Sequence, residues 1–355
     1  MKVFVLMSGG VDSSVSALLL KLNNYETIGA HIQCFGYCNP QDEEDARRVA
    51  EKLKIPFYVF EFTEEFENKI IDYFVKTYAN GLTPNPDVRC NEFIKFGSFF
   101  EKAMNLQTDF VASGHYAKIL KVNNKYYLQQ PKDLNKDQTY FLWSIKRDYL
   151  EKIIFPLADY YKSEVREIAR KYELPVAEKK DSMGICFIGT VKLREFLSKY
   201  LKPRKGFIID IEGNILGEHG GYYFYTEGQR HGLNIKTGQG PYYVVGKIKE
   251  NNLVVVAKEG HPSLFSQKVY LIEVNLLAEE LLKAKTEVLV RFRHRQPLVK
   301  ATFHRDNNLI IFEKPEKMIA PGQSIVMYNN QGIVLGGGVI LKREPDFTDF
   351  LKMNQ

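Results

Sequence analysis

The chain has 355 residues, 45% of them hydrophobic and 26% charged, which predicts two or three globular domains and excludes a disordered tail, a fibrous repeat or a small disulfide-rich protein. Its net charge of +6 allows a nucleic-acid partner without demanding one. No apolar run reaches the roughly 18 residues that a bilayer requires, so we expect a soluble, cytoplasmic protein with no membrane partner.

Strands and helices are expected to alternate over the first 130 residues. Short apolar strands are predicted at 2–7, 27–32, 57–60 and 109–112. Amphipathic helices are predicted at 12–22, 42–54, 64–79 and 91–104. This βαβ rhythm predicts a doubly wound parallel sheet with helices on both faces.

The second half of the chain changes character. Residues 140–200 resemble a mainly helical segment, whereas short Val/Ile/Tyr-rich runs separated by glycine and asparagine turns begin near residue 206. We therefore expect three domains: an α/β domain over 1–203, a small β-rich domain over 204–263 and a C-terminal β-barrel over 264–355.

The strongest local signal is the run Ser8-Gly9-Gly10-Val11-Asp12-Ser13, between the first expected strand and helix. The two glycines allow the backbone to approach a ligand, and the N–H groups of the first helical turn would face an anion. The chain has neither a GxGxxG nor a GxxxxGK[ST] motif at this turn. SGGxDS is instead similar to the pyrophosphate loop of the ATP pyrophosphatase superfamily, whose adenylation chemistry needs Mg²⁺ with ATP.

Two of the four cysteines stand in polar, turn-rich loops. Cys90 lies at an expected helix start, where the helix dipole and Arg89 would lower its pKa, and Asp87 lies within reach as an acid or base. Cys186 lies in a glycine-containing loop near Lys179 and Lys180.

The other two cysteines, Cys34 and Cys38, have no charged activator beside them, so we interpret both as packed residues. No CxxC pair occurs, so a structural zinc site is not expected. In the cytoplasm the thiols would be reduced.

Eight motifs follow one another along the chain: SGGVDS, TPNPDVRCNEFIKFG, SGHYAK, KDQTYFLW, DSMGICFIG, GEHGGYYFYTEGQRHGL, RFRHRQP and APGQSIVMY. Together they closely resemble the bacterial tRNA-specific 2-thiouridylase family, from residue 2 to about residue 341. The resemblance implies an ATP-dependent tRNA sulfurtransferase. It would adenylate the C2 oxygen of the wobble uridine in the tRNAs for Lys, Glu and Gln, and a persulfide sulfur would then replace that oxygen, giving 2-thiouridine, AMP and pyrophosphate.

The resemblance also implies roles for the residues that match the family motifs. ATP would be bound in the domain over 1–203 by Leu6, Met7, Ser8, Gly9, Gly10, Val11, Asp12, Ser13, Ile32 and Gly114. The target base would be surrounded by Asn85, Pro86 and Asp87. The catalytic residues would be Asp87 as acid/base, Cys186 as the persulfide carrier and Cys90 as its nucleophile or resolving thiol. The tRNA contacts would come from His115, Lys136, Asp137, Gln138, Arg293, His294 and Gln323.

A basic stretch supports the expected tRNA contact. Arg291, Arg293, His294 and Arg295 fall on an expected strand, where alternation would point the three arginines to one face, toward tRNA phosphates. The C2 atom of a uridine in a stacked anticodon loop is out of reach, so the base would have to be extruded.

Three alternatives remain open from the sequence. Asp87, Cys90 and Cys186 would also serve as ligands of a [4Fe–4S] cluster that carries the sulfur; we favour the persulfide, because two cysteines and one carboxylate are an unusual ligand set. A synthetase that adenylates a small molecule would leave the cysteines and the barrel without a purpose. A non-catalytic RNA-binding protein would be expected to have a disrupted loop at residues 8–13.

The expected partners are the anticodon stem-loop of tRNA and a sulfur donor, either a cysteine desulfurase or a sulfur-relay protein. We expect the protein to act as a monomer.

Overall fold

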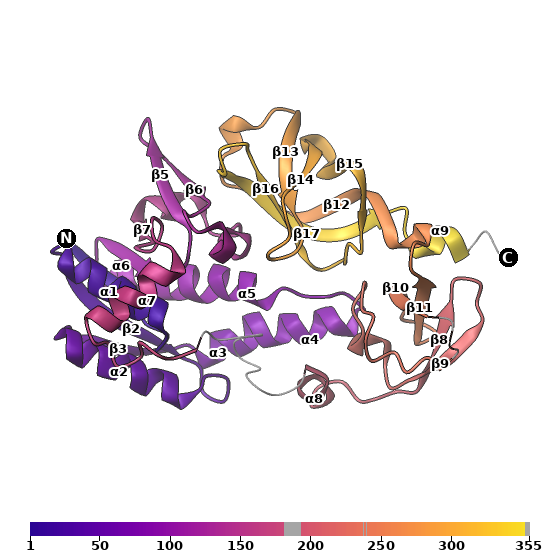
Figure 1. Ribbon diagram of the computed structural model, residues 1–355, viewed down its shortest axis with the longest axis horizontal. Coiled ribbons are helices and arrows are strands. Elements are labelled where there is room, and N and C mark those ends of the chain that lie inside the picture. Colours follow the sequence, from indigo (N-terminus) through magenta and orange to yellow (C-terminus); the bar gives the residue numbers. More distant parts are fainter. Residues whose placement is uncertain (181–192, 237, 239, 352–355) are drawn as a thin grey trace.

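The computed structural model describes residues 1–180, 193–236, 238 and 240–351. Its N-terminal part is a five-stranded parallel sheet in the order β3-β2-β1-β4-β7 (Figure 1). The strands are β1 (Lys2–Leu6), β2 (Glu26–Gln33), β3 (Phe57–Glu61), β4 (Phe110–Ser113) and β7 (Ile153–Ile154). The order reverses at β1, as in a doubly wound fold, which confirms the predicted fold class.

Side chains of β1 alternate between two hydrophobic cores because successive residues of a strand face opposite ways. Val3 and Val5 pack in one core with α1 (Val11–Leu22), α2 (Pro40–Leu53) and α7 (Lys162–Lys171). Phe4 and Leu6 pack in the other core with the remaining helices of this domain. These are α3 (Thr63–Phe66), η1 (Glu67–Ile71), α4 (Asp72–Ala79), α5 (Pro86–Arg89), η2 (Cys90–Ser98) and α6 (Phe99–Asn105). Helices therefore cover both faces of the sheet.

The connection after β4 differs from the sequence-based expectation. It forms the hairpin β5 (Lys118–Val122) and β6 (Lys125–Gln129), then the short segments η3 (Leu134–Lys136), η4 (Thr139–Phe141) and η5 (Arg147–Lys152). In the described part of 140–200 the helical segments are the end of η4, η5, α7 and α8 (Leu193–Ser198). They cover only about half of these residues, so the region is less helical than expected. Large apolar side chains such as Trp143 are buried without helical spacing, and Asn275 of the barrel binds the carbonyl oxygens of Trp143 and Ile145.

The middle part is a four-stranded sheet in the order β10-β11-β8-β9. Its strands are β8 (Gly206–Asp210), β9 (Ile215–His219), β10 (Tyr242–Ile248) and β11 (Leu253–Lys258), and the turn η6 (Tyr222–Phe224) follows β9. Strands β8 and β11 are parallel, and the other pairs are antiparallel.

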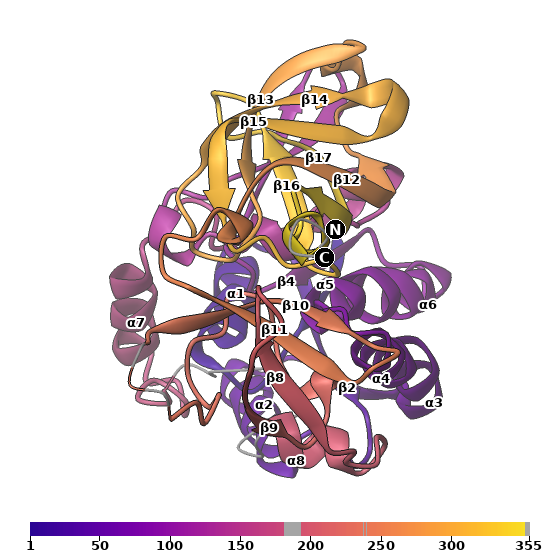
Figure 2. The ribbon, with the colours of Figure 1, turned by 90° about the vertical axis from the view of Figure 1, so that its right-hand side faces the viewer.

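The C-terminal part is a closed barrel in the order β12-β15-β14-β13-β16-β17, as predicted. Its strands are β12 (Phe265–Leu276), β13 (Lys285–Arg291), β14 (Val299–His304), β15 (Leu309–Lys317), β16 (Ser324–Tyr328) and β17 (Val334–Glu344). Three short turns, η7 (Pro262–Leu264), η8 (Glu279–Leu281) and η9 (Arg305–Asn307), and the last helix α9 (Phe347–Leu351) complete it. In the view of Figure 2 the barrel lies above the parallel sheet and the middle sheet.

Within the described residues, no helix combines the length and the apolar character that a membrane span needs.

Candidate active site

The loop of residues 8–13 joins β1 to α1 where the sheet order reverses. Strand β2 lies on one side of β1 and β4 on the other, and this is the position at which doubly wound sheets bind their ligands. Gly10 is the N-cap of α1, and no side chain caps this helix start. The first-turn N–H groups of α1 are therefore suited to bind an anionic group such as a phosphate.

Two glycines allow three backbone segments to meet at this point: the loop of residues 8–13, the first turn of α2 and the residue after β4. Gly9 has a φ of +69°, and a Cβ atom there would lie 2.2 Å from the carbonyl oxygen of Asp42. A Cβ atom on Gly114, directly after β4, would lie 2.7 Å from the backbone nitrogen of Ser13. The loop also holds itself together, since the backbone N–H of Ser8 donates to Oγ of Ser13 at 3.1 Å. A larger residue at position 9 or 114 would displace backbone.

Asp12 is bound by two side chains from distant parts of the chain. Its two carboxylate oxygens lie 2.7 and 2.8 Å from Nζ of Lys162, and the hydroxyl of Tyr116 donates to it at 3.0 Å. Sequence reasoning missed Lys162, because only the fold brings α7 next to α1. The pair places a carboxylate and a cation beside the predicted phosphate site.

Lys179 adds a second cation beside the same loop. Its Nζ donates to the carbonyl oxygen of Gly9 at 3.1 Å and lies 2.7 and 2.6 Å from carboxylate oxygens of Asp42 and Asp45. Burial alone would lower the pKa of Lys179, but these carboxylates hold it above its ordinary value. The lysine therefore stays charged and fastens the start of α2 to the loop.

Of the other predicted ATP residues, Leu6 and Met7 are buried and Ile32 is partly buried. The carbonyl oxygen of Met7 lies 2.8 Å from Nδ1 of His31. Ile32 lies near the carboxyl end of β2, next to β1 in the sheet, so the predicted ATP residues gather at one edge.

The second candidate segment, called here the Asp87–Cys90 loop, leads into the helical turns of α5 and η2, which carry Asp87 and Cys90. Oδ1 of Asn85 accepts from the backbone N–H of Val88 at 3.4 Å and so caps the helix, and Pro86 follows as its first residue. Asp87 is half-buried, and Cys90 is 7% exposed. Burial raises the pKa of Asp87 above its ordinary value, which is the direction expected of a carboxyl group that acts as an acid or base.

The charge of Lys95 acts both on Asp87 and on His115, the residue after Gly114. This charge opposes the rise in the pKa of Asp87. Burial, together with the charge of Lys95, lowers the pKa of His115 well below its ordinary value, so its imidazole is neutral at pH 7. Nδ1 of His115 lies 2.7 Å from Oγ of Ser113. Asp87, Lys95 and His115 thus share one electrostatic environment, and Lys95 is not among the residues predicted from the sequence motifs.

The barrel holds the Asp87 loop from outside. Nε2 of Gln323 donates to the carbonyl oxygens of Thr83 and Pro84 at 3.1 and 2.9 Å, and the N–H of Thr83 donates to the carbonyl of Pro321 at 2.9 Å. Gln323 therefore positions the loop, whether or not it also contacts RNA.

Arg89 makes a further link between the loop and the barrel. Its guanidinium pairs with Glu92 at 2.9 Å and with Glu273 of β12. The expectation that Arg89 activates the Cys90 thiol finds no support in these contacts, because two carboxylates neutralise its charge.

The Lys136-Asp137-Gln138 segment is mostly engaged inside the protein. Asp137 is buried, pairs with Arg291 at 2.8 Å and accepts from the N–H of Thr139 at 2.9 Å. Oε1 of Gln138 accepts from the N–H of Tyr116 at 2.9 Å, while Lys136 is partly exposed. Their predicted tRNA contacts remain a prediction.

The predicted basic row on one strand is wrong. Strand β13 ends at Arg291, whose side chain is buried against Asp137, and the chain then turns, with Arg295 at a φ of +64°. Arg293 and Arg295 are exposed beyond the strand end. The ring of His294 packs 4.5 Å from that of Phe141. The guanidinium of Arg293 also donates to the carbonyl oxygen of Met318, so a phosphate contact by Arg293 would have to use its remaining N–H groups.

Cys186 lies outside the described residues, so its place relative to Cys90 and Asp87 is not described. Within the described part, no cluster of three or more His, Cys, Asp or Glu side chains is arranged to hold a metal ion.

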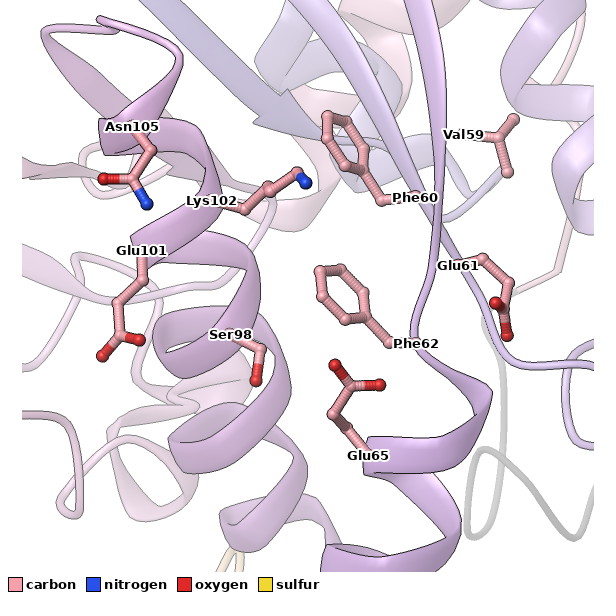
Figure 3. Close-up of a pocket in the computed structure, with 9 residues that line it drawn as sticks. All are labelled: Val59, Phe60, Glu61, Phe62, Glu65, Ser98, Glu101, Lys102 and Asn105. Atoms are coloured by element: carbon pink, nitrogen blue, oxygen red, sulfur yellow. The ribbon is translucent and has the colours of Figure 1, made fainter.

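A cavity of about 590 Å³ lies apart from these loops, between β3 and α6 (Figure 3). Its charged lining comprises Glu61, Glu65, Glu101 and one cation, Lys102. Because carboxylates predominate, the cavity is unsuited to ATP or RNA phosphates, and it contains none of the predicted site residues.

Three family models match consecutive parts of the chain. Residues 1–190 match the tRNA methyl transferase HUP domain, residues 194–258 the tRNA methyl transferase PRC-barrel domain and residues 266–340 the aminomethyltransferase beta-barrel domain.

Curated relatives match over nearly the whole chain. The tRNA-specific 2-thiouridylase MnmA of Listeria monocytogenes is 43% identical over 350 residues, which cover 96% of this chain and 94% of the relative. The tRNA-specific 2-thiouridylase MnmA of Halalkalibacterium halodurans is 41% identical over 359 residues, with 97% and 96% covered.

Among solved structures, a 4-thiouridine synthetase–RNA complex with bound ATP has a TM-score of 0.35 and 15% identity, covering 56% of this chain and 50% of its own. A TM-score this low supports no conclusion about fold or function.

Proposed function

The chain belongs to the tRNA-specific 2-thiouridylase family, and from this membership we propose how its two loops divide the reaction. It is an ATP-dependent tRNA sulfurtransferase that exchanges the C2 oxygen of a wobble uridine for sulfur. One observation carries the assignment of the site: Gly114 meets the backbone of Ser13 in the first loop, and the ring of His115, the next residue, lies 5.9 Å (between ring centroids) from that of Phe96 in η2, which begins at Cys90.

The first loop would bind ATP as its magnesium complex. The N–H groups at the start of α1 would face the phosphates. Lys162 and Lys179, whose charges are paired with Asp12 and with Asp42 and Asp45, would hold Asp12 and the start of α2 in place beside them. Ile32 and Gly114 would contact the nucleotide. Bound here, ATP would be open to attack by the uridine C2 oxygen, which forms an adenylate and releases pyrophosphate.

The second loop would receive the extruded uracil among Asn85, Pro86 and Asp87. The raised pKa of Asp87 suits a group that takes or returns a proton as C2 is attacked. A persulfide on Cys186 would attack C2 and displace AMP. The Cys90 thiolate would then attack Sγ of Cys186, so that the persulfide bond breaks, sulfur stays on C2 and a Cys90–Cys186 disulfide forms.

We retain the [4Fe–4S] cluster only as the competing hypothesis. Asp87 and Cys90 lie one turn apart on one helix, and the third residue lies outside the described part. The persulfide route needs no cluster.

The barrel and the partly exposed Lys136 would bind the anticodon stem-loop, with Arg293 on tRNA phosphates and His115, His294 and Gln323 near the target nucleotide. Asp137 and Gln138 would support this surface from inside. The sulfur donor would be a cysteine desulfurase or a relay protein, and the enzyme would act as a monomer in the cytoplasm.

A pyrophosphate-release assay tests the substrate class. Release should depend on ATP, Mg²⁺ and tRNA lacking the modification, and free amino acids should not stimulate it. Stimulation by an amino acid or another small molecule, with none by tRNA, would favour a small-molecule synthetase. The Cys186→Ser variant should bind tRNA and release pyrophosphate but form no 2-thiouridine.

A further inference from the structure

The motif GEHGGYYFYTEGQRHGL of the middle domain has no part in the two loops of the candidate active site. Its residues 226–232, called here the middle-domain loop, form a compact turn. The N–H of Gln229 donates to the carbonyl of Thr226 at 2.9 Å, and Oε1 of Gln229 accepts from the N–H of Thr226 at 3.1 Å. Nε2 of Gln229 donates to the carbonyl of His231 at 2.8 Å, and the N–H of Val244 in β10 donates to the carbonyl of Gln229 at 3.0 Å. The side chain of Gln229 therefore fixes the shape of the loop.

The barrel holds the middle-domain loop from the other side. In the view of Figure 1, β10 is the strand of the middle sheet nearest to the barrel. Glu227 pairs at 3.1 Å with the buried Arg343 of β17. Gly228 has a φ of +84°, and a Cβ atom there would lie 2.9 Å from Cβ of Met318 and 3.2 Å from a guanidinium nitrogen of Arg293. The loop is thus pressed against the barrel at the point where Arg293 lies.

Two exposed arginines meet at this contact between the domains. Arg230 follows Gly228 by two residues, which span at most about 7 Å, so the stem of its side chain begins close to Arg293. Arg291 and Arg343 pair with carboxylates, but neither Arg230 nor Arg293 does so among the residues that the structure describes. Arg293 uses part of its guanidinium on the carbonyl of Met318 and retains other N–H donors. Two cations without a carboxylate partner, one from each domain, suit a phosphodiester backbone.

This pair of arginines lies beside the Asp87–Cys90 loop. His294, the neighbour of Arg293, packs with its ring 4.5 Å from that of Phe141. The carbonyl of Phe141 accepts from Nδ2 of Asn91, the residue after Cys90, at 2.9 Å. An extruded base turns about its own backbone, and contacts to phosphates fix the register of the strand. Phosphates near the target uridine would therefore lie within reach of this surface.

We propose that the middle-domain loop is a phosphate-binding element for tRNA, in which Arg230 contacts a backbone phosphate next to the phosphate bound by Arg293. This inference rests on the proposed function, which makes tRNA the substrate. Glu227 and Gln229 are positioning residues, because they hold the loop against the barrel and fix its turn. The middle domain and the barrel then hold the anticodon strand together, each through one arginine.

Titration of fluorescent glutamate tRNA lacking the modification, at about 50 and 200 mM salt and without ATP, tests the contact. Arg230→Ala should bind more weakly than the parent and reduce the salt slope by about 1. Its deficit in affinity should therefore be about fourfold larger at the lower salt concentration than at the higher one. Arg230→Lys, which keeps the charge, should retain the parent slope. Parent affinity of Arg230→Ala at both salt concentrations would overturn the proposal.

Arg204→Ala is the matched control, because Arg204 is another exposed arginine of the middle domain. Its carbonyl accepts from Nδ2 of Asn252, directly before β11, at 3.0 Å. The middle-domain loop instead adjoins Val244, which pairs with Val256 near the other end of β11. Arg204→Ala should therefore bind tRNA as the parent does. An equal loss in both variants would assign the effect to overall charge and would overturn the proposal.

Ethylation of single tRNA phosphates locates the contact. In the parent, ethylation at two neighbouring phosphates of the anticodon stem-loop should block binding. Arg230→Ala should become insensitive at one of them and Arg293→Ala at the other, whereas a change for Arg230→Ala outside the stem-loop would overturn the proposal. Circular dichroism of each variant, with Arg230→Lys as the second replacement, excludes misfolding as the cause.

Failure of this inference and failure of the proposed function have different signatures. A parent that forms 2-thiouridine, with Arg230→Ala binding tRNA equally tightly, would overturn only the role of the loop. A parent that forms no 2-thiouridine, but shows the expected salt slopes and ethylation pattern, would overturn the proposed reaction and support the phosphate contact.

Discussion

Replacement of the two adjacent glycines of the ATP loop by alanine should have very different effects on stability. At Gly9, alanine would have to adopt a left-handed conformation, which costs about 1–2 kcal/mol. Its Cβ would also lie 2.2 Å from the carbonyl oxygen of Asp42, a backbone atom that moves only with α2. Overpacking of this kind costs about 1–3 kcal/mol more. The expected loss for Gly9→Ala is therefore about 2–5 kcal/mol, or a fall of about 4–20 °C in Tm.

Gly10→Ala is the matched control. Gly10 has a φ of −98°, and its Cβ would meet only Oγ of Ser8, at the ordinary contact distance of 3.6 Å. Alanine is a poorer N-cap residue than glycine, which lowers stability, but it also reduces the entropy of the unfolded chain, which raises stability. These two effects nearly cancel, so the free energy of unfolding should change by no more than about 1 kcal/mol. Both variants are compared without nucleotide by thermal and urea denaturation. Equal stabilities would refute the account of the backbone contact between the loop and α2.

Four further predictions concern single residues. Asp12→Ala should lose pyrophosphate release, because it removes the carboxylate held by Lys162; release at the parent rate would disprove the assignment of the ATP loop. Asp87→Asn should gain stability relative to the parent as pH rises from 4 to 8. The raised pKa of Asp87 stabilises the folded parent at low pH, and this stabilisation is lost as the carboxyl group ionises. A difference in the free energy of unfolding by urea that does not change with pH would contradict this prediction. Arg293→Ala should weaken tRNA binding and reduce the salt slope by about 1, whereas unchanged affinity at every salt concentration would exclude a phosphate contact. Gln323→Leu should lower kcat more than it raises KM for tRNA, since it releases the carbonyls of Thr83 and Pro84, and an effect on KM alone would make Gln323 a tRNA contact only.

The sequence predicted the N-terminal sheet because its signals are local. Apolar runs of strand length, helical spacing and the Ser8–Ser13 motif all lie within short windows, and β1 alternates between two cores as such a strand must. The C-terminal barrel was also predicted from local signals, namely turn residues between apolar runs of strand length, and the structure has a closed barrel there. The prediction of helix after residue 140 was less accurate, because the aromatic side chains of this segment are buried against other domains and do not form one face of a helix.

Residues that act through partners far along the chain were not predictable from local patterns. Lys162 lies 150 positions from Asp12, and nothing near it in sequence indicates the ion pair. Arg291 was predicted to share one face with Arg293 and Arg295, because side chains alternate along a strand. The strand ends at Arg291, however, and its buried guanidinium pairs with Asp137. The domain boundaries at 203 and 263 and the roles of the site residues remain predictions.

The most direct test of the central claim is anaerobic thiolation of glutamate tRNA lacking the modification. Purified protein, ATP, Mg²⁺, a cysteine desulfurase and cysteine are combined, and the digested tRNA is examined by mass spectrometry for replacement of oxygen by sulfur in uridine. Protein without iron should form 2-thiouridine at the same rate as protein reconstituted with iron and sulfide. Thiolation only after reconstitution would contradict the persulfide route, and no thiolation in either sample would contradict the proposed function itself.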